Sequence, residues 1–292
     1  MSKLRVKSDI VFKRIFAHKG NEEFLIQFLS ALLKVNITSI DIMHDIHLEK
    51  DIEEDKLGIL DVRAIIDKKE IVNIEIQIKD LKNIVQRSTF YASKIVSNQL
   101  VQAEQYQNIK PVIAICILDY EFLPYEDYIN DTKTVLSNHR DYEINPYVKY
   151  IYIELPKFRK SVKKYDDIIS QWLTFIDGVN SRGLEEAMEK NETVRKAQEE
   201  LEYLEGDEAF KRKVELKEKY EKDMNSAIHY GKEEGMKKGL QEGLQKGLKE
   251  GLQEGKKSEK KSIAKKMLEI GMDVEQIMKI TDLSKEEIEK LK

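Results

Sequence analysis

Residues 58–79 read GILDVRAIIDKKEIVNIEIQIK, and this stretch decides the fold class. Residues 59–66 and 71–78 are rich in β-branched side chains, which favours two strands. The polar residues 67–69 between them predict the turn of a β-hairpin. In the second strand isoleucines alternate with polar residues, so we expect one apolar face and one polar face.

Helices and further strands are expected on both sides of this hairpin. The helical spacing of apolar residues predicts four helices, at residues 9–16, 22–34, 83–107 and around Trp172. Ser8 is the candidate N-cap of the first helix. Two later apolar runs, PVIAICIL at 111–118 and KYIYIEL at 149–155, are typical of strands. Strands separated by helices predict an α/β domain with one sheet and helices on both of its faces.

The composition changes after residue 182. Residues 183–257 consist mainly of helix-forming residues, and a glycine recurs every four residues from Gly231 to Gly255. A row with a period of four winds around a helix by ~40° per step, because the helix has ~3.6 residues per turn. We therefore interpret residues 183–257 as a charged helical linker. The alternative is self-association through this tail, which would make a homo-oligomer.

Residues 258–292 predict a small unit of three short helices, with Gly271 at one helix end. The spacing of these helices resembles a helix-turn-helix. The last helix carries Glu286, Glu287 and Glu289, however, and these carboxylates would repel DNA. We therefore expect a packing or oligomerisation unit. The predicted division of the chain is residues 1–182, 183–257 and 258–292.

Charge, cysteine content and hydropathy indicate the cellular compartment of the protein and the kinds of partner it can have. The net charge is −4 and charged residues make up 36% of the chain, so a strongly basic nucleic-acid binder is not indicated. Cys116 is the one cysteine, which excludes a disulfide within the chain and fits a reducing compartment. No apolar run approaches the ~18 residues that a membrane span needs. We expect a soluble cytoplasmic protein without a membrane partner.

Asp61 and Glu75 are the candidate catalytic pair. If Ile66 faces Glu70 across the turn, Asp61 falls opposite Glu75, with Cβ atoms ~5 Å apart. Two carboxylates this close repel each other unless a cation lies between them, and Mg²⁺ is commonly held by one or two carboxylates. Gln77 follows on the same face and could orient a water molecule. The plainer interpretation is that all three are solvated residues of a half-exposed sheet.

A family resemblance favours the catalytic interpretation. The segments SDIVFKRIF, GILDVRAIIDKKEIVNIEIQ, QRSTFYASKIVSNQLVQAEQY and IKPVIAICILDYEF resemble, in this order, the Rpn family. Its members are recombination-promoting nucleases or proteins described as transposases, within the PD-(D/E)XK nuclease superfamily. The resemblance covers roughly residues 5–180, and the glycine-rich tail is also similar. It implies a restriction-endonuclease-like core with a mixed sheet flanked by helices, followed by a long helical extension.

The resemblance also implies the roles of individual residues. Asp61 and Glu75 match the metal-binding carboxylates, and the backbone carbonyl of Ile76 is a further expected ligand. Gln77 stands where the superfamily pattern has a lysine, as in the E-x-Q form of this family. Lys79 could supply the missing charge, and Asp9 resembles an acidic residue that the opening helix adds to such sites. An ordinary solvated lysine and a helix-capping Asp9 are the competing interpretations.

Four residues on two predicted helices are candidates for contact with DNA. Arg87 and Tyr91 would share one face of a helix, where the resemblance implies a pair close to the site. A packed surface pair is the competing interpretation. Lys13 and Arg14 belong to a local basic excess that could meet a phosphate backbone. The expected activity is Mg²⁺-dependent hydrolysis of double-stranded DNA, with Mn²⁺ or Ca²⁺ as substitutes in vitro, linked to recombination or mobile elements. The alternative is a DNA-binding or assembly protein that has this fold but little or no turnover.

Overall fold

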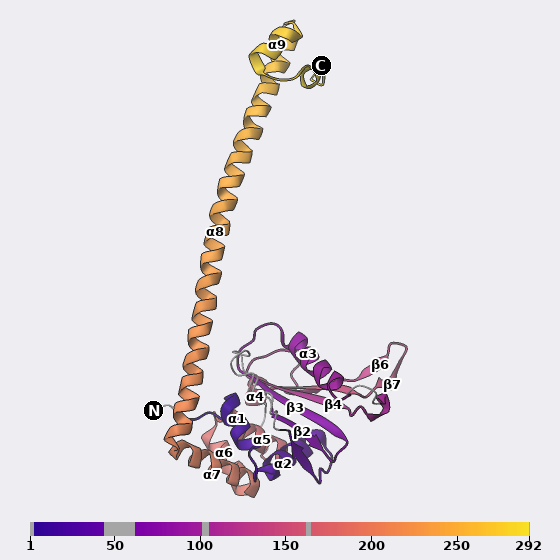
Figure 1. The fold of residues 1–292 in the computed structure, drawn as a ribbon, viewed down its shortest axis with the longest axis vertical. Coiled ribbons are helices and arrows are strands. Elements are labelled where there is room, and N and C mark those ends of the chain that lie inside the picture. Colours follow the sequence, from indigo (N-terminus) through magenta and orange to yellow (C-terminus); the bar gives the residue numbers. More distant parts are fainter. Residues whose placement is uncertain (1–2, 44–61, 101–104, 162–164, 292) are drawn as a thin grey trace. The chain divides into compact units, whose positions relative to one another are not determined.

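The computed structural model describes residues 3–43, 62–100, 105–161 and 165–291. The chain divides into two compact units, Met1–Glu215 and Leu216–Lys292. The first unit is the predicted α/β domain, and the second consists of helices (Figure 1). Among the helices that the structure describes, none combines the length and the apolar character needed to cross a bilayer.

A six-stranded mixed sheet forms the centre of the first unit (Figure 1). The order across the sheet is β1 (Ile40–Ile42), β2 (Val62–Ile66), β3 (Glu70–Gln77), β4 (Val112–Leu118), β8 (Val148–Glu154) and β5 (Ile129–Asp131). β3, β4 and β8 run parallel, and the other pairs are antiparallel. A separate ribbon consists of β6 (Thr134–Leu136) and β7 (His139–Asn145). The parallel pair β3 and β4 is joined through a helix, as a parallel connection requires.

The hairpin of β2 and β3 has the predicted register. Ile66 pairs with Glu70, and the described pairing extends to Val62 and Ile74. Asp67 and Lys68 have positive φ angles of 47° and 59°, the left-handed conformation that suits a tight hairpin turn. Hydrogen bonds from the backbone of Ser39 and from Thr38 hold the pKa of Asp67 below its usual range. The turn is therefore tied to the segment that leads into β1.

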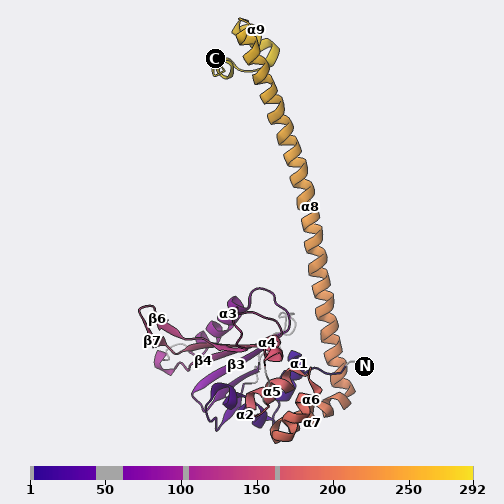
Figure 2. The ribbon, with the colours of Figure 1, turned by 180° about the vertical axis from the view of Figure 1, so that it is seen from behind.

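Helices cover both faces of the sheet (Figures 1 and 2). One face packs against the N-terminal helices and α5, and the other against α3. The bounds of these and the neighbouring helices are α1 Asp9–Phe16, α2 Glu22–Leu33, α3 Ile84–Ser97, α4 Leu155–Lys160 and α5 Ile168–Asp177, with a 3₁₀ turn at Tyr106–Asn108. Trp172 is fully buried on the first face, against Phe16, Phe24 and Phe28.

Two local expectations need correction. The helix expected at residues 83–107 ends at Ser97, where the chain turns, and residues 101–104 lie outside the described part. Ser8 precedes α1 at the N-cap position, but its side chain makes no capping hydrogen bond. The first turn is instead served by Asp9, whose Oδ1 accepts a hydrogen bond from the Ile10 amide at 2.6 Å.

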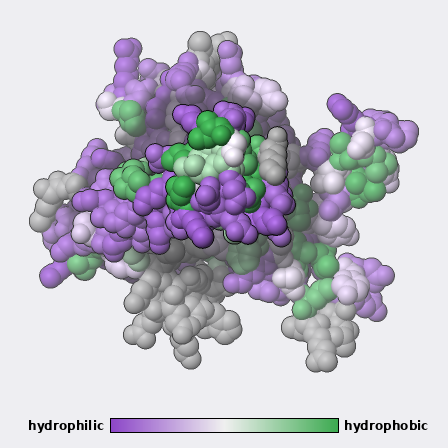
Figure 3. All heavy atoms as spheres, turned by 90° about the horizontal axis from the view of Figure 1, so that it is seen from above, coloured by the Kyte–Doolittle hydropathy of each residue, from purple (hydrophilic) through white to green (hydrophobic). Residues whose placement is uncertain are grey.

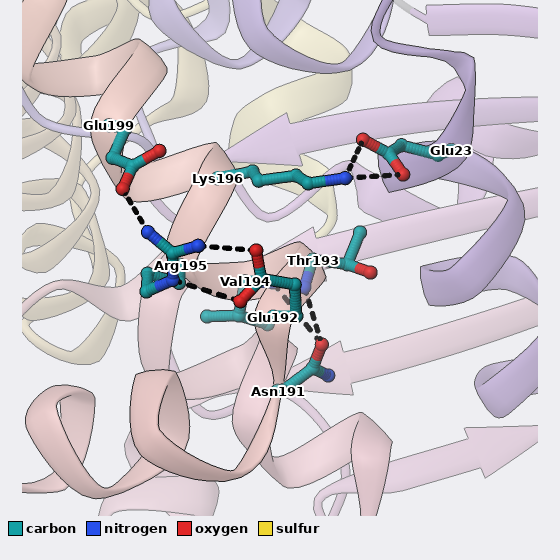
Figure 4. Close-up of polar contacts among 8 residues, drawn as sticks. All are labelled: Glu23, Asn191, Glu192, Thr193, Val194, Arg195, Lys196 and Glu199. Carbon is teal, nitrogen blue, oxygen red and sulfur yellow. Dashed lines mark hydrogen bonds and ion pairs between the residues drawn. The ribbon is translucent and has the colours of Figure 1, made fainter.

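The first unit continues past the expected boundary at residue 182. α6 (Ser181–Lys190) and α7 (Glu192–Gly206) place Ala187, Val194 and Leu201 in its core. Asn191 caps α7 by accepting hydrogen bonds from the amides of Thr193 and Val194 (Figure 4). Ion pairs between α7 and the N-terminal helices, Lys196 with Glu23 and Arg14 with Glu200, add polar ties. The composition shift after residue 182 marks charged outer faces of core helices.

One continuous helix, α8 (Glu208–Glu269), runs through the glycine repeat. Each glycine weakens a helix interior by ~1 kcal/mol relative to alanine. The intervening residues are strong helix formers, and ion pairs one turn apart add support. Examples are Lys238 with Glu234 at 3.1 Å and Lys246 with Glu250 at 3.9 Å.

The C-terminal part, residues 258–291, contains three helical segments. They are the end of α8, α9 (Val274–Thr281) and α10 (Lys285–Glu289). Ala264, Ile277, Leu283 and Ile288 form its small core. Gly271, with a φ of 80°, follows the end of α8, and Ser284 with Glu287 forms a capping box at the start of α10. Figure 3 shows a mostly hydrophilic surface with smaller hydrophobic patches.

Candidate active site

The polar face of β3 is buried. Asn73, Glu75 and Gln77 each have less than a tenth of their surface exposed, on the side of the sheet that α3 covers. The same face carries apolar residues where β4 passes under α3. Buried polar side chains in the middle of a sheet are uncommon and require partners. The interpretation of these residues as solvated is therefore wrong for Glu75 and Gln77.

Arg87 is the partner of Glu75. This arginine lies in the first turn of α3, and both its Nε and an Nη atom donate to Oε1 of Glu75, the Nε at 3.1 Å. The Glu75 side chain is 7% exposed and that of Arg87 is 30% exposed. The guanidinium therefore compensates a nearly buried carboxylate while it keeps contact with solvent. Its carbon also lies 5.6 Å from the ring centre of Tyr91, close enough for a cation–π contact.

Gln77 is held by a tyrosine that the sequence analysis did not single out. Tyr120, two residues after β4, donates its hydroxyl to Oε1 of Gln77 at 3.2 Å. Burial of the ring, followed by the nearby charge of Asp80, raises the pKa of Tyr120. The hydroxyl therefore keeps its proton at neutral and moderately alkaline pH. Because Oε1 is occupied as an acceptor, Gln77 presents its amide nitrogen as a donor.

The backbone of β3 directs the Ile76 carbonyl toward β2. The Gln77 carbonyl accepts a hydrogen bond from the Asp119 amide at 3.0 Å, on the β4 side. Successive residues of a strand direct their carbonyls to opposite neighbours. The Ile76 carbonyl consequently points to the strand that follows Asp61 in the sequence. The Glu75 carboxylate and the Ile76 carbonyl are therefore neighbouring oxygen groups on one strand that could act as metal ligands.

Asp61 lies outside the described residues, so its predicted position opposite Glu75 stays a prediction. The pairing that supports it is present as far as Val62 with Ile74. One further step of the same antiparallel register would align residue 61 with residue 75.

The remaining candidates lie just after β3 and on α1. Lys79 follows the end of β3 and is exposed. Asp9 begins α1, where it accepts a hydrogen bond from the next amide. Arg14 is bonded to Glu200 of α7 at 3.0 Å, and Lys13 is half-buried on the same helix. The described contacts therefore give Asp9 and Arg14 local structural partners.

A second charged cluster lies at the end of β4. Asp119 accepts hydrogen bonds from Lys7 at 2.7 Å and from Arg159, and Arg159 also bonds Asp177. Lys7 and Asp177 are 3.6 Å apart. This cluster of two cations and two carboxylates joins the N-terminal segment, β4, α4 and α5. The Asp119 amide also holds the Gln77 carbonyl, so the cluster supports the end of β3. Nothing in the spacing of these four residues predicts it.

The oxygen ligands that β3 offers, the Glu75 carboxylate and the Ile76 carbonyl, are chemically suited to a hard divalent cation. A carboxylate and a backbone carbonyl are the oxygen ligands that Mg²⁺ prefers. Both hydrogen bonds from Arg87 go to Oε1 of Glu75, and none from the described residues reaches Oε2. Within the described ranges no three acidic, histidine or cysteine residues come together as a metal site. A complete site would thus need Asp61 or another ligand.

The chain is similar to two known protein families. A family model described as "PD-(D/E)XK nuclease family transposase" matches residues 6–231. A second, described as "Rpn/YhgA-like nuclease family, C-terminal HTH domain", matches residues 257–292. No curated protein and no solved structure matches the chain. The second match favours a helix-turn-helix for the C-terminal unit, in place of the expected packing unit.

Proposed function

The chain belongs to the PD-(D/E)XK nuclease family of transposases, and from this membership we propose that it hydrolyses DNA phosphodiester bonds with the help of Mg²⁺. The family supports a nuclease-like or transposase-related function. The observation that carries the more specific proposal is the buried carboxylate of Glu75, two residues before a buried Gln77. Both lie on the same face of a central strand.

Asp61, Glu75 and the Ile76 carbonyl would hold the cation. A bound Mg²⁺ supplies Lewis-acid polarisation of the phosphate and lowers the pKa of a coordinated water. Arg87 already holds Glu75 in place, so the site requires little rearrangement. Gln77 cannot take a proton. Its amide nitrogen instead donates to a water or to a phosphate oxygen, which orients the reacting group.

Arg87 has two roles in this proposal. It neutralises Glu75 when no cation is present. Its planar guanidinium also matches a phosphate, and its partly exposed side chain is accessible to the nucleic acid. DNA binding is further supported by the helix-turn-helix match. The start of that region, residues 256–266, contains six lysines and one glutamate, which suits contact with a phosphate backbone.

Incubation of the purified chain with supercoiled plasmid tests the proposed activity. We expect relaxed or linear product with Mg²⁺ and intact plasmid with EDTA, because the proposed reaction needs a cation to polarise the phosphate and to activate a water. Mn²⁺ should replace Mg²⁺, since both accept oxygen ligands. Cleavage that is equally fast in EDTA would contradict the metal requirement.

The second candidate is a DNA-binding or assembly protein without turnover. Gln77 favours it, because a neutral amide replaces the charged lysine of the superfamily pattern. The helix-turn-helix match is equally compatible with this function. A gel-shift assay on the same plasmid fragments separates the candidates. A binding protein would retard DNA without nicking it under any metal condition.

Tyr120→Phe should slow cleavage by ~3- to 10-fold, the effect of one ordinary hydrogen bond. Without the hydroxyl, the Gln77 amide is free to turn and to present the wrong atom. The rate is measured at saturating DNA for Tyr120→Phe alone and in a Gln77→Leu background. Leucine can neither accept nor donate a hydrogen bond, so the Tyr120 substitution should have no effect there. An equal loss in both backgrounds would show that Tyr120 acts independently of Gln77.

A further inference from the structure

The outer surface of α3 carries no carboxylate. Residues 81–103, which include this helix, form the longest stretch of the chain without aspartate or glutamate. α3 lies on the outside of the sheet (Figures 1 and 2). Its exposed side chains are Val85, Gln86, Thr89, Phe90, Ser93, Lys94 and Ser97. α7, by contrast, carries five glutamates in its 15 residues. In a chain with a net charge of −4, an exposed surface without negative charge is suited to a polyanion.

Phe90 lies at the centre of this surface, and 61% of it is exposed. Gln86 and Lys94 are its neighbours one turn away on either side, and Arg87 is a third neighbour, because residues three and four apart share a helix face. The rings of Phe90 and Tyr91 are in contact, with centres 5.3 Å apart and planes at 78°. Single exposed apolar residues are common on proteins. The position of Phe90, beside the proposed nuclease site, is what gives it meaning.

Arg87 connects this surface to the nuclease site. Its guanidinium bonds Glu75 on the sheet side of the helix, and 30% of its side chain is exposed. Along the helix axis Phe90 lies only ~4.5 Å from Arg87, since each residue adds ~1.5 Å. A nucleotide whose phosphate contacts Arg87 would therefore place its own base, or the next one, close to the Phe90 ring. Lys94 lies one turn further along and can meet a neighbouring phosphate.

A phenyl ring recognises the face of a base. It carries no hydrogen-bonding group, so it cannot distinguish base edges by donors and acceptors. In a duplex the base faces are covered by the neighbouring pairs, whereas unpaired bases can stack on an aromatic side chain. An exposed aromatic ring flanked by cations is the combination that binds single strands. The surface of α3 therefore fits a strand with unpaired bases better than it fits a duplex.

We propose that the outer surface of α3 binds an unpaired segment of DNA, with a base stacked on Phe90 and phosphates at Arg87 and Lys94. The identity of the ligand as DNA rests on the proposed function. The inference deepens that function by naming the substrate structure: a strand end, a gap or a locally opened duplex. Supercoiled plasmid offers such openings, because negative supercoiling favours strand separation.

Fluorescence anisotropy of the full chain in EDTA tests the binding without cleavage. The probes are a labelled single strand of ~20 nucleotides, longer than the site of one small binding domain, and a duplex of the same sequence. Phe90→Ala should raise the dissociation constant for the single strand by ~10-fold or more, because base stacking is lost. Phe90→Trp should stay within ~3-fold of the native value, since an indole also stacks on bases.

The matched control is Tyr203→Ala. Tyr203 is 69% exposed on α7, among glutamates, and its loss should leave both affinities unchanged. The affinity for the duplex should change by less than ~2-fold in all three variants, because duplex bases do not reach the ring. An unchanged single-strand affinity in Phe90→Ala, or an equal loss for strand and duplex, would overturn the proposal.

Photo-crosslinking locates the stacked base. A single strand that carries 5-iodouracil should crosslink to Phe90 on irradiation, because this base reacts with an aromatic ring stacked on it. Crosslinks confined to residues 257–292, the helix-turn-helix match, would overturn the proposal.

The two proposals fail separately. Metal-dependent plasmid cleavage together with native single-strand affinity in Phe90→Ala would overturn the stacking surface alone. Binding that depends on Phe90, without cleavage under any metal condition, would support this surface and overturn only the nuclease activity.

Discussion

Glu75→Gln should lower the rate of Mg²⁺-dependent plasmid cleavage by ~10³-fold or more, which corresponds to about 4 kcal/mol of lost transition-state stabilisation. The substitution retains the size and one oxygen of the side chain. It removes the negative charge that would hold the cation beside the phosphate. The cleavage rate is measured with supercoiled plasmid at saturating Mg²⁺, and also at raised Mg²⁺ to detect weakened metal binding.

The fold should survive this change. The amide oxygen of the new glutamine can still accept the hydrogen bonds that Arg87 donates to Oε1 of Glu75. Glu70→Gln is the matched control, because Glu70 begins the same strand and is only partly buried at the turn end. We expect it to leave the cleavage rate within ~2-fold of the native rate, as for surface substitutions in general. Loss of cleavage in both variants would indicate a damaged sheet in place of a lost ligand.

The hairpin was predictable from sequence because its signals are local. Alternating isoleucines and polar residues specify the faces of β3, and the polar turn specifies its pairing with β2. The observed register of Ile66 with Glu70 confirms this prediction. The same argument explains why Glu75 and Gln77 could be placed on one face. It does not reveal whether that face is covered, which depends on the packing of α3.

The partners of the site depend on contacts between distant segments. Arg87 was singled out from the resemblance as a DNA contact, but its bond to Glu75 follows from how α3 crosses the sheet. Tyr120 lies 43 residues from Gln77, and no spacing rule joins them. The domain boundary predicted from the change in composition after residue 182 was also wrong for α6 and α7. Their charged residues suggested a linker, while the few apolar residues on their inner faces belong to the core.

Glu154→Ala should produce a large loss of stability in the first unit. Glu154 ends β8, and its side chain is completely buried. Its Oε1 accepts a hydrogen bond from Lys157 at 2.7 Å, and its Oε2 accepts one from the Phe122 amide at 2.6 Å. Lys157 also donates to the Leu123 carbonyl at 2.7 Å. The pair therefore anchors the segment after β4 to the start of α4.

Removal of the carboxylate leaves the Lys157 ammonium, which is only 7% exposed, without its counter-charge. Breaking a buried ion pair in this way typically destabilises a protein by ~3–5 kcal/mol. We expect a free energy of unfolding lower by about that amount, from urea titration followed by the fluorescence of Trp172. Trp172 is the one tryptophan and is fully buried in the same unit, so its signal reports the unfolding of this unit.

Glu121→Ala is the control because it removes a carboxylate from a neighbouring ion pair that water surrounds. The side chains of Lys160 and Glu121 are 72% and 50% exposed. Exposed pairs contribute ~0–1 kcal/mol, since water replaces the lost partner. A large difference between the two variants would show that burial, and not the ion pair as such, sets the stability. If both variants lose less than ~1 kcal/mol, the Lys157 side chain must reach water once its partner is gone, and the anchor between β4 and α4 would be weak.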